Sequence, residues 1–191
     1  MNFPVSYAAV TQVVNRMADD VAGLNATYNN LISGYGLTTE LAIVFDPSNQ
    51  KSKNFALANV SDQDWQKSGA FNYPLVSIFS EGMVNENYQK FQMFAGNVKV
   101  GMNVFLSWNT TRLRLDQFEP TAWAMEEAVI TIMNRARNAD PGDQEWNNNG
   151  AIVAYNGEFS LLKSKVERGD SFWRQLLAFK FDFLVIQGGP S

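Results

Sequence analysis

Residues 98–108, with the sequence VKVGMNVFLSW, decide the fold of this chain. Apolar side chains occupy every second position from Val98 to Trp108, and most positions between them are polar or glycine. A period of two over this length predicts a long β-strand with one buried face. We place its earliest start at Phe91, with Gly96 marking a bulge or a bend.

Three further segments predict strands of the same sheet. The stretch 75–79, LVSIF, begins just after Pro74, at a position where a missing N–H is tolerated. Residues 151–159 predict a second strand. In residues 177–185, Leu, Phe and Val alternate with Ala, Lys, Asp and Leu, which predicts a closing strand.

Two segments carry the residue spacing of amphipathic helices. The first runs from Tyr7 to Leu24 and ends near Gly23. Its apolar face comprises Val10, Val13, Val14, Met17, Val21 and Leu24. The second runs from Pro120 to Arg137, because proline suits the first helical position, where its missing N–H would have no partner.

The order of these elements predicts an α+β fold, with a mainly antiparallel sheet and two principal helices packed on one face. We expect one domain over residues 1–191, since hydrophobic residues make up 46% of the chain and no linker interrupts it. Residues 25–70 would be an insertion. It would consist of a loop over 25–40 and a short hairpin formed by 41–45 and 55–60.

The chain contains no histidine and no cysteine. Their absence excludes Ser-His-Asp and Cys-His catalysis, histidine or cysteine zinc sites, iron–sulfur clusters and disulfides. Carboxylate, lysine, tyrosine or serine–lysine chemistry remains, or no chemistry at all. We expect no cofactor and no enzymatic activity. The net charge of −4 comes without a basic patch, which argues against nucleic-acid binding. No apolar run approaches the roughly 20 residues that cross a bilayer, and no signal peptide is recognised, so we expect synthesis in a cytoplasm.

Two groups of residues could carry chemistry, and each has a structural interpretation. Ser160 and Lys163 match the Ser-x-x-Lys pattern of serine–lysine acyl transferases. On a strand, positions three apart point to opposite faces, so we interpret the match as a coincidence. Asp140, Asp143 and Glu145 offer carboxylates to a hard cation, but their spacing differs from that of a calcium-binding loop. A solvated loop is the favoured interpretation, and cation binding stays open.

Two pairs of adjacent carboxylates, Asp19–Asp20 and Glu126–Glu127, fall in the predicted helices. Adjacent helical residues diverge by about 100°, so neither pair can form a joint acid/base site. We interpret both as parts of solvated helix faces. A carboxylate-only glycosidase is the hydrolase class that is compatible with the absence of histidine.

Two features point to a partner. Trp146 lies in a polar loop predicted over residues 139–150, and it either folds back onto the core or anchors an interface. Both interpretations stay open. The closing strand carries Phe on one face and the apolar residues Leu184 and Ile186 on the other. Coverage on both faces of a strand in a domain of this size points to a partner subunit.

The chain also carries a characteristic series of segments. They are YPLVSI at 73–78, GNVKV at 96–100, MEEAV at 125–129, GD at 169–170, WRQ at 173–175 and FKFDF at 179–183. In element order and texture, residues 5–24 and 71–187 resemble the tail terminator (tail completion) proteins of long-tailed bacteriophages and related neck proteins. Residues 25–70 depart from the compact members of that family.

The resemblance implies a structural virion protein, made in the host cytoplasm and without catalytic residues. Its subunits would form a hexameric ring that terminates the tail tube and joins it to the head. The implied partners are further copies of the chain, the tail tube, and neck or connector proteins. DNA would only pass through the lumen, where an acidic surface repels phosphates. No membrane contact is implied.

The functional residues implied by the resemblance lie in interface and lumen loops. We assign candidates to the loop 143–149, to the connection 49–53 and to the closing strand. The candidates are Asn49, Lys51, Lys53, Asp143, Glu145, Trp146, Asn147, Phe183 and Val185. The alternatives are another tail component (tube, baseplate or head-completion subunit), a soluble adaptor, or, from a different class, a carboxylate-only hydrolase.

Overall fold

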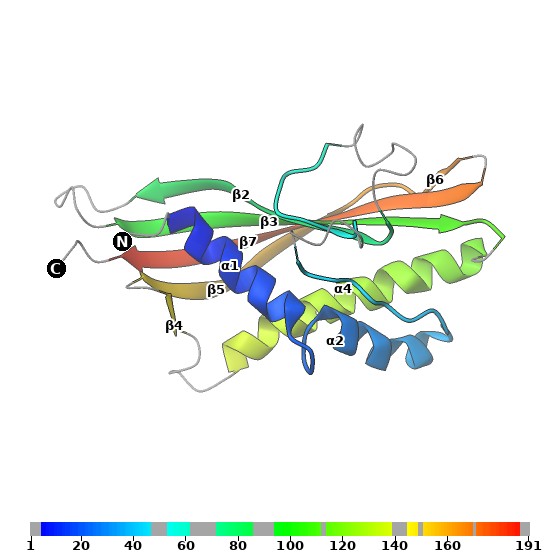
Figure 1. Cartoon of the computed structure of the whole chain (residues 1–191), viewed down its shortest axis with the longest axis horizontal. Coiled ribbons are helices and arrows are strands. Elements are labelled where there is room, and N and C mark those ends of the chain that lie inside the picture. The colour runs from blue at the N-terminus through cyan, green and yellow to red at the C-terminus, as the bar shows by residue number, and fades with distance from the viewer. Residues whose placement is uncertain are drawn as a thin grey trace.

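A computed structural model describes residues 5–46, 53–61, 72–85, 94–111, 114–138, 145–148, 151–169 and 171–187. Within these ranges seven strands form one mixed sheet in the order β1-β2-β3-β7-β5-β4, with β6 paired to β7 off this path (Figure 1). The strands are β1 (Phe55–Ala56), β2 (Leu75–Asn85), β3 (Phe94–Asn109), β4 (Glu145–Asn148), β5 (Ala151–Lys163), β6 (Glu167–Arg168) and β7 (Phe172–Gln187). The predicted α+β fold with a mainly antiparallel sheet is confirmed.

The centre of the sheet is the antiparallel pair β3 and β7, which stays in register from Phe94↔Gln187 to Asn109↔Phe172. The predicted alternation is confirmed on both strands, because one side chain in two faces the core. The buried residues of this central pair are Val98, Val100, Met102, Val104, Leu106, Leu177, Phe179, Phe181, Phe183 and Val185. Apolar alternation on these neighbouring strands therefore builds the sheet side of the core, and the buried faces of the helices supply the other side.

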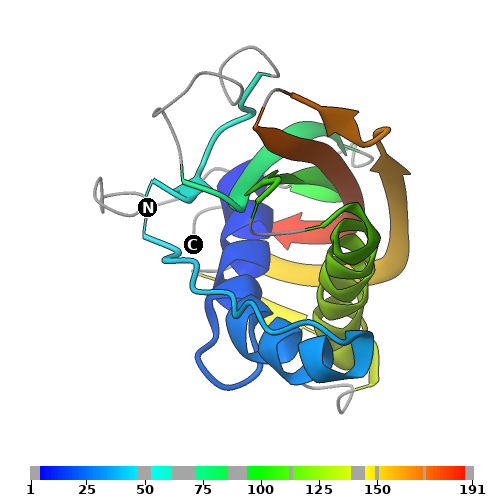
Figure 2. The same ribbon diagram turned by 90° about the vertical axis from the view of Figure 1, so that its right-hand side faces the viewer.

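The helices are α1 (Val5–Ala18), α2 (Leu24–Leu31), the 3₁₀ helix η1 (Ile32–Tyr35) and α4 (Leu115–Asn138). The curved sheet wraps around α1 and α4, while α2 packs on α4 (Figure 2). The expectation of two helices packed on one face is not confirmed as stated, because α2 forms a further helix in a region predicted as loop. None of the helices in the described part of the chain is both long and apolar enough to cross a membrane.

The first helix is shorter than predicted because Asp19 stops it. The Asp19 Oδ1 atom accepts hydrogen bonds from the N–H groups of Val21 (2.9 Å) and Ala22 (2.6 Å). Gly23 then donates to the Asp19 carbonyl at 2.9 Å, and α2 begins at the next residue. Val21, predicted on the buried face, is 86% exposed. The helix predicted over 7–24 is therefore wrong beyond Ala18, and the loop predicted over 25–40 is wrong from Asn25 to Tyr35, which α2 and η1 occupy.

The hairpin predicted from 41–45 and 55–60 is also wrong. Residues 41–45 belong to no strand, and β1 pairs in parallel with β2 instead. The extended segment hydrogen-bonds to asparagine side chains: Asn25 and Asn29 bind the backbone of Ile43 and Leu41. Asn54 binds on the other side, to the backbone of Ala42 and Val44. Side-chain amides thus replace a neighbouring strand for this segment.

Three further features differ from the sequence prediction. The last helix begins at Leu115, so Pro120 lies within the helix and not at its first position. At the start of the helix the Arg114 carbonyl accepts hydrogen bonds from the N–H groups of Gln117 and Phe118, at 3.0 and 3.1 Å. Gly96 pairs regularly, and the register shift of this strand pair lies between Ser80 and Gly82. Part of the loop predicted over 139–150 is the strand β4, which pairs with the start of β5.

Candidate functional site

The candidate interface residues of the closing strand lie in the core. Phe183 and Val185 are fully buried, and Phe183 pairs with Val98 of β3 and Tyr155 of β5. Their side chains therefore stabilise the subunit itself and offer no surface to a partner, which corrects the interface prediction at these two positions. The residues beside them in sequence, Leu184 and Ile186, point to the opposite, convex face of the sheet.

The described residues of the two candidate loops, Lys53 and 145–148, belong to different parts of the fold. Asn49, Lys51 and Asp143, like Asp140 of the candidate cation site, lie outside the described residues. Lys53 is exposed with a φ of 50°, and its carbonyl accepts from Asn72. Glu145, Trp146 and Asn147 belong to β4, at the opposite end of the strand order from β1, and pair with Ala154, Val153 and Ile152.

The convex face of the sheet carries an apolar surface that sequence analysis indicated only in part. Val84 of β2 and Leu184 of β7 pair with Asn97 of β3 from its two sides. Ile186 pairs with Ala95, two residues further along the strands. Val84 is 57% exposed, Leu184 37% and Ile186 38%. We call these three residues the outer apolar row. Val84 lies on β2, and Leu184 and Ile186 lie on β7, with Asn97 and Ala95 of β3 between the two strands.

Charged residues border the outer apolar row on the same face. Lys99 and Asp182 occupy the next paired position on β3 and β7. Lys180 lies two residues before Asp182 on β7, and its Nζ atom contacts Glu81 Oε1 at 3.0 Å. Polar residues around an apolar centre are the composition expected of a surface that binds another protein.

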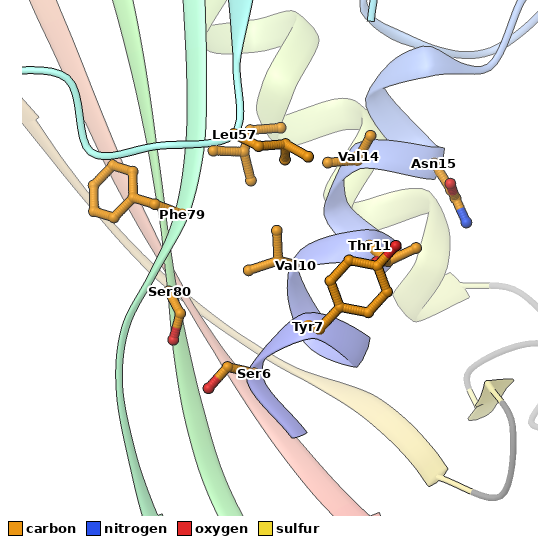
Figure 3. Close-up of a pocket in the computed structure, with 10 residues that line it drawn as sticks. Ser6, Tyr7, Val10, Thr11, Val14, Asn15, Leu57, Phe79 and Ser80 are labelled. Carbon is orange, nitrogen blue, oxygen red and sulfur yellow. The ribbon is translucent and has the colours of Figure 1, made fainter. Parts of the chain in front are cut away.

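A second surface is the α1–β2 groove, of about 450 Å³, between the first helix and the edge of the sheet (Figure 3). It is lined by Ser6, Tyr7, Val10, Thr11, Val14, Asn15, Leu57, Ile78, Phe79 and Ser80. Val10 points from α1 into the space between helix and strand, and Leu57 closes one end (Figure 3). Sequence analysis missed this groove, because the apolar stripe of α1 does not tell which of its residues the sheet leaves uncovered. Val13 and Met17 fill the core, and Val10 and Val14 remain to line the groove.

The Ser-x-x-Lys match has the structural interpretation that the sequence predicted. Ser160 pairs with Lys180 of β7, which lies on the convex face, while Lys163 pairs with Leu177, whose side chain is in the core. Lys163 Nζ lies 2.7 Å from Glu126 Oε1 and 3.1 Å from Glu119 Oε2. Burial alone lowers the pKa of Lys163, but the hydrogen bonds to Glu126 and Glu119 outweigh it and raise the pKa overall. Lys163 is thus held as a cation and is unsuited to act as a general base.

The carboxylates of α4 bind side chains of neighbouring elements. Glu119 and Glu126 are brought close by their common partner Lys163, which links the helix to β5. Glu127, adjacent to Glu126, instead accepts a hydrogen bond of 2.5 Å from the Tyr35 hydroxyl. These carboxylates stabilise the packing of α4 on its neighbours. Among the described residues, no group of three or more Asp and Glu side chains is placed to hold a metal ion.

No family model matches this chain, and no curated protein sequence matches it. A functional assignment therefore depends on the surfaces described above. The two that stand out are the outer apolar row and the α1–β2 groove.

Proposed function

We propose that this protein is a structural subunit of a ring that terminates a bacteriophage tail tube and joins it to the head or neck. The observation that carries the proposal is the outer apolar row. Val84, Leu184 and Ile186 leave a strip of apolar side chains in water on the convex face of the sheet. The alternate side chains of β3 and β7 are buried in the core on the concave face, whereas the row on the convex face is exposed and can contact another molecule.

A ring follows from the kind of contact that such a strip makes. If the outer apolar row binds a different surface of the next copy, the contact is heterologous, and repeated heterologous contacts close into a ring when the rotation allows. The order and texture of the elements resemble those of tail terminator proteins, which supports the closed ring over an open filament. The tail tube and the neck would then be bound by the two faces of the ring.

Charge is consistent with DNA passing through such a ring. The chain carries 15 basic and 19 acidic residues, giving a net charge of −4. Six copies would concentrate this negative charge, and phosphates would be repelled rather than retained. DNA is therefore proposed to pass through without binding.

Electron microscopy of the purified protein mixed with phage tail tubes tests the proposal. We expect a ring of about six subunits at one end of each tube. Val84→Arg, which places a charge in the outer apolar row, should abolish both ring and attachment. Leu162→Arg is the matched control, because Leu162 is an exposed apolar residue on β5, even more exposed than Val84, but lies outside the row. Decoration along the whole tube, or attachment at a baseplate, would instead identify another tail component and overturn the ring assignment.

A further inference from the structure

Residues 38–44, which we call the strap, are held by side chains rather than by a neighbouring strand. Among the described residues, no hydrogen bond joins the main chain of the strap to the main chain of another element. Its backbone groups at positions 41–44 bond instead to the side chains of Asn25, Asn29 and Asn54, through six hydrogen bonds. Figure 2 shows the strap as a light blue trace along α2. Three amide side chains thus take the place that strands would have on either side of it.

The strap contributes two side chains to the core. Leu41 and Ile43 are each 4% exposed, whereas Val44 is 41% exposed. On the concave face of the sheet, β3 and β7 alone bury ten apolar side chains. In the part of the chain that the structure describes, no strand pair includes a strap residue. Release of the strap would therefore uncover two apolar side chains and leave the described strand pairs intact.

A cavity of about 240 Å³ borders the strap. Strap residues 39–43 form one part of its lining, and Tyr28 and Trp108 bring α2 and β3 to it. The other lining residues are Asn54, Tyr73 and Pro74. Atoms beside a cavity lack packing partners on that side, so the strap loses part of the dispersion energy that a fully packed strand gains.

Both ends of the strap are fixed to elements that need not move when it opens. Before it, Gly36 has a φ of 68°, and the N–H groups of Gly36 and Leu37 close η1 by donating to carbonyls of that helix at 3.2 and 2.9 Å. Glycine reaches other backbone conformations at little steric cost, and a Cβ atom at position 36 would meet no atom within 4 Å. The chain can therefore change direction at this residue. After the strap, the ring of Phe45 lies 5.2 Å from that of Phe55 in β1.

We propose that the strap opens as a unit while the sheet and α2 stay folded, and that this opening joins the cavity to solvent beside Tyr28 and Trp108. Opening exchanges the six asparagine hydrogen bonds for bonds to water and uncovers Leu41 and Ile43. Segments with few buried apolar contacts open at a lower free energy than the core of the same protein. The three asparagines are thus the latch of a conformational device.

This proposal does not depend on the ring. The strap shares no residue with the outer apolar row, so each proposal can fail without the other.

The absence of cysteine from the chain allows the opening to be measured by thiol labelling. The variants Ile43→Cys, Val100→Cys and Val44→Cys each carry one thiol, and its rate of reaction with dithionitrobenzoate is measured without urea and in low urea. Val100→Cys reports unfolding of the sheet, because Val100 is 0% exposed, and Val44→Cys reports a thiol that is always accessible. Circular dichroism confirms that each variant is folded. Hydrogen exchange at the Leu41 and Ile43 amides, followed by NMR, gives the same comparison in the unsubstituted protein.

We expect Ile43→Cys to react roughly tenfold or more faster than Val100→Cys, and more slowly than Val44→Cys. Low urea should accelerate Val100→Cys and leave Ile43→Cys nearly unchanged, because a local opening exposes little surface. Adding Asn29→Ala should raise the rate of Ile43→Cys by roughly fivefold or more, because it removes two bonds of the closed strap. Asn30→Ala is the matched control and should leave that rate unchanged, since Asn30 is exposed on the same helix.

Equal rates at positions 43 and 100, with the same dependence on urea, would overturn the proposal, because the strap would then open only when the whole protein unfolds. Equal rates at positions 43 and 44 would also overturn it, because the strap would then never be closed. In the unsubstituted protein, exchange of the Leu41 and Ile43 amides as slow as that of the slowest amides of β3 and β7 would contradict a local opening.

Discussion

Asn25, on the first turn of α2, hydrogen-bonds to both backbone groups of Ile43. Its Nδ2 atom donates to the Ile43 carbonyl at 2.8 Å, and its Oδ1 atom accepts from the Ile43 N–H at 2.9 Å. Asn29, one helical turn later, makes the same pair of bonds to Leu41 at 3.0 and 2.7 Å. Two amides spaced four residues apart on a helix thus satisfy alternate residues of an extended segment, as a neighbouring strand would.

Replacing these amides tests their contribution to stability. Asn25→Ala and Asn29→Ala should each lower the free energy of unfolding by about 1–3 kcal/mol, because each leaves a partly buried backbone N–H and C=O without partners. Urea unfolding followed by circular dichroism measures the loss. Asn30→Ala is the matched control, because Asn30 is exposed on the same helix and should change stability by less than about 0.5 kcal/mol. Equal effects at positions 25 and 30 would contradict the role of the amides.

The turn between α1 and α2 requires glycine at position 23. A Cβ atom there would lie 2.3 Å from the Asp19 carbonyl oxygen and 2.6 Å from that of Met17. Gly23→Ala should therefore destabilise the protein by about 1–3 kcal/mol, because backbone atoms must move apart. Gly34→Ala meets no atom within 4 Å and should be neutral or slightly stabilising. Thermal unfolding of the two variants gives the comparison, and a neutral Gly23→Ala would contradict this geometry.

Lys163 links α4 to β5 through two carboxylates. Lys163→Met should destabilise the protein by about 1–2 kcal/mol, a value reduced by the partial solvent exposure of all three side chains. The double variant Lys163→Met with Glu126→Gln should recover part of the loss, because it removes a carboxylate that has lost its partner. Urea unfolding at low and high salt measures both effects. A single variant as stable as the natural protein would show that the contact is only a surface ion pair.

Tyr28 makes the free energy of unfolding depend on pH in the alkaline range. Burial raises the pKa of Tyr28 from its ordinary value of 10.0 to about 12, and a hydrogen bond with Thr121 opposes this shift. Because the folded protein keeps a proton that the unfolded chain releases, this stabilisation is fully present below pH 10 and is lost as pH rises toward 12. Lys163, whose pKa is also raised, contributes in the same direction. Tyr28→Phe should therefore show a smaller loss of stability between pH 9 and 11 than the natural protein, measured by urea unfolding; an unchanged slope would contradict the assignment.

The central strands could be predicted because their signal is local. Alternation in 98–108 and 177–185 is a property of each stretch alone, and burial of Met102 and Phe179 follows from it. The segment 41–45 has the composition of a strand, but its partners are Asn25 and Asn29, and asparagine gives no periodic signal. The α1–β2 groove depends on how α1 packs beside β2, a long-range relationship that the pattern of α1 does not contain.

The mass of the assembly in solution tests the central claim, that this chain is a ring subunit. Native mass spectrometry, with sedimentation velocity at several concentrations, gives that mass directly. The account predicts a discrete closed species of six subunits, about 128 kDa from six chains of 21.4 kDa, that Val84→Arg converts to monomer and Leu162→Arg does not. A strict monomer at all concentrations and in the presence of tail tubes would contradict it.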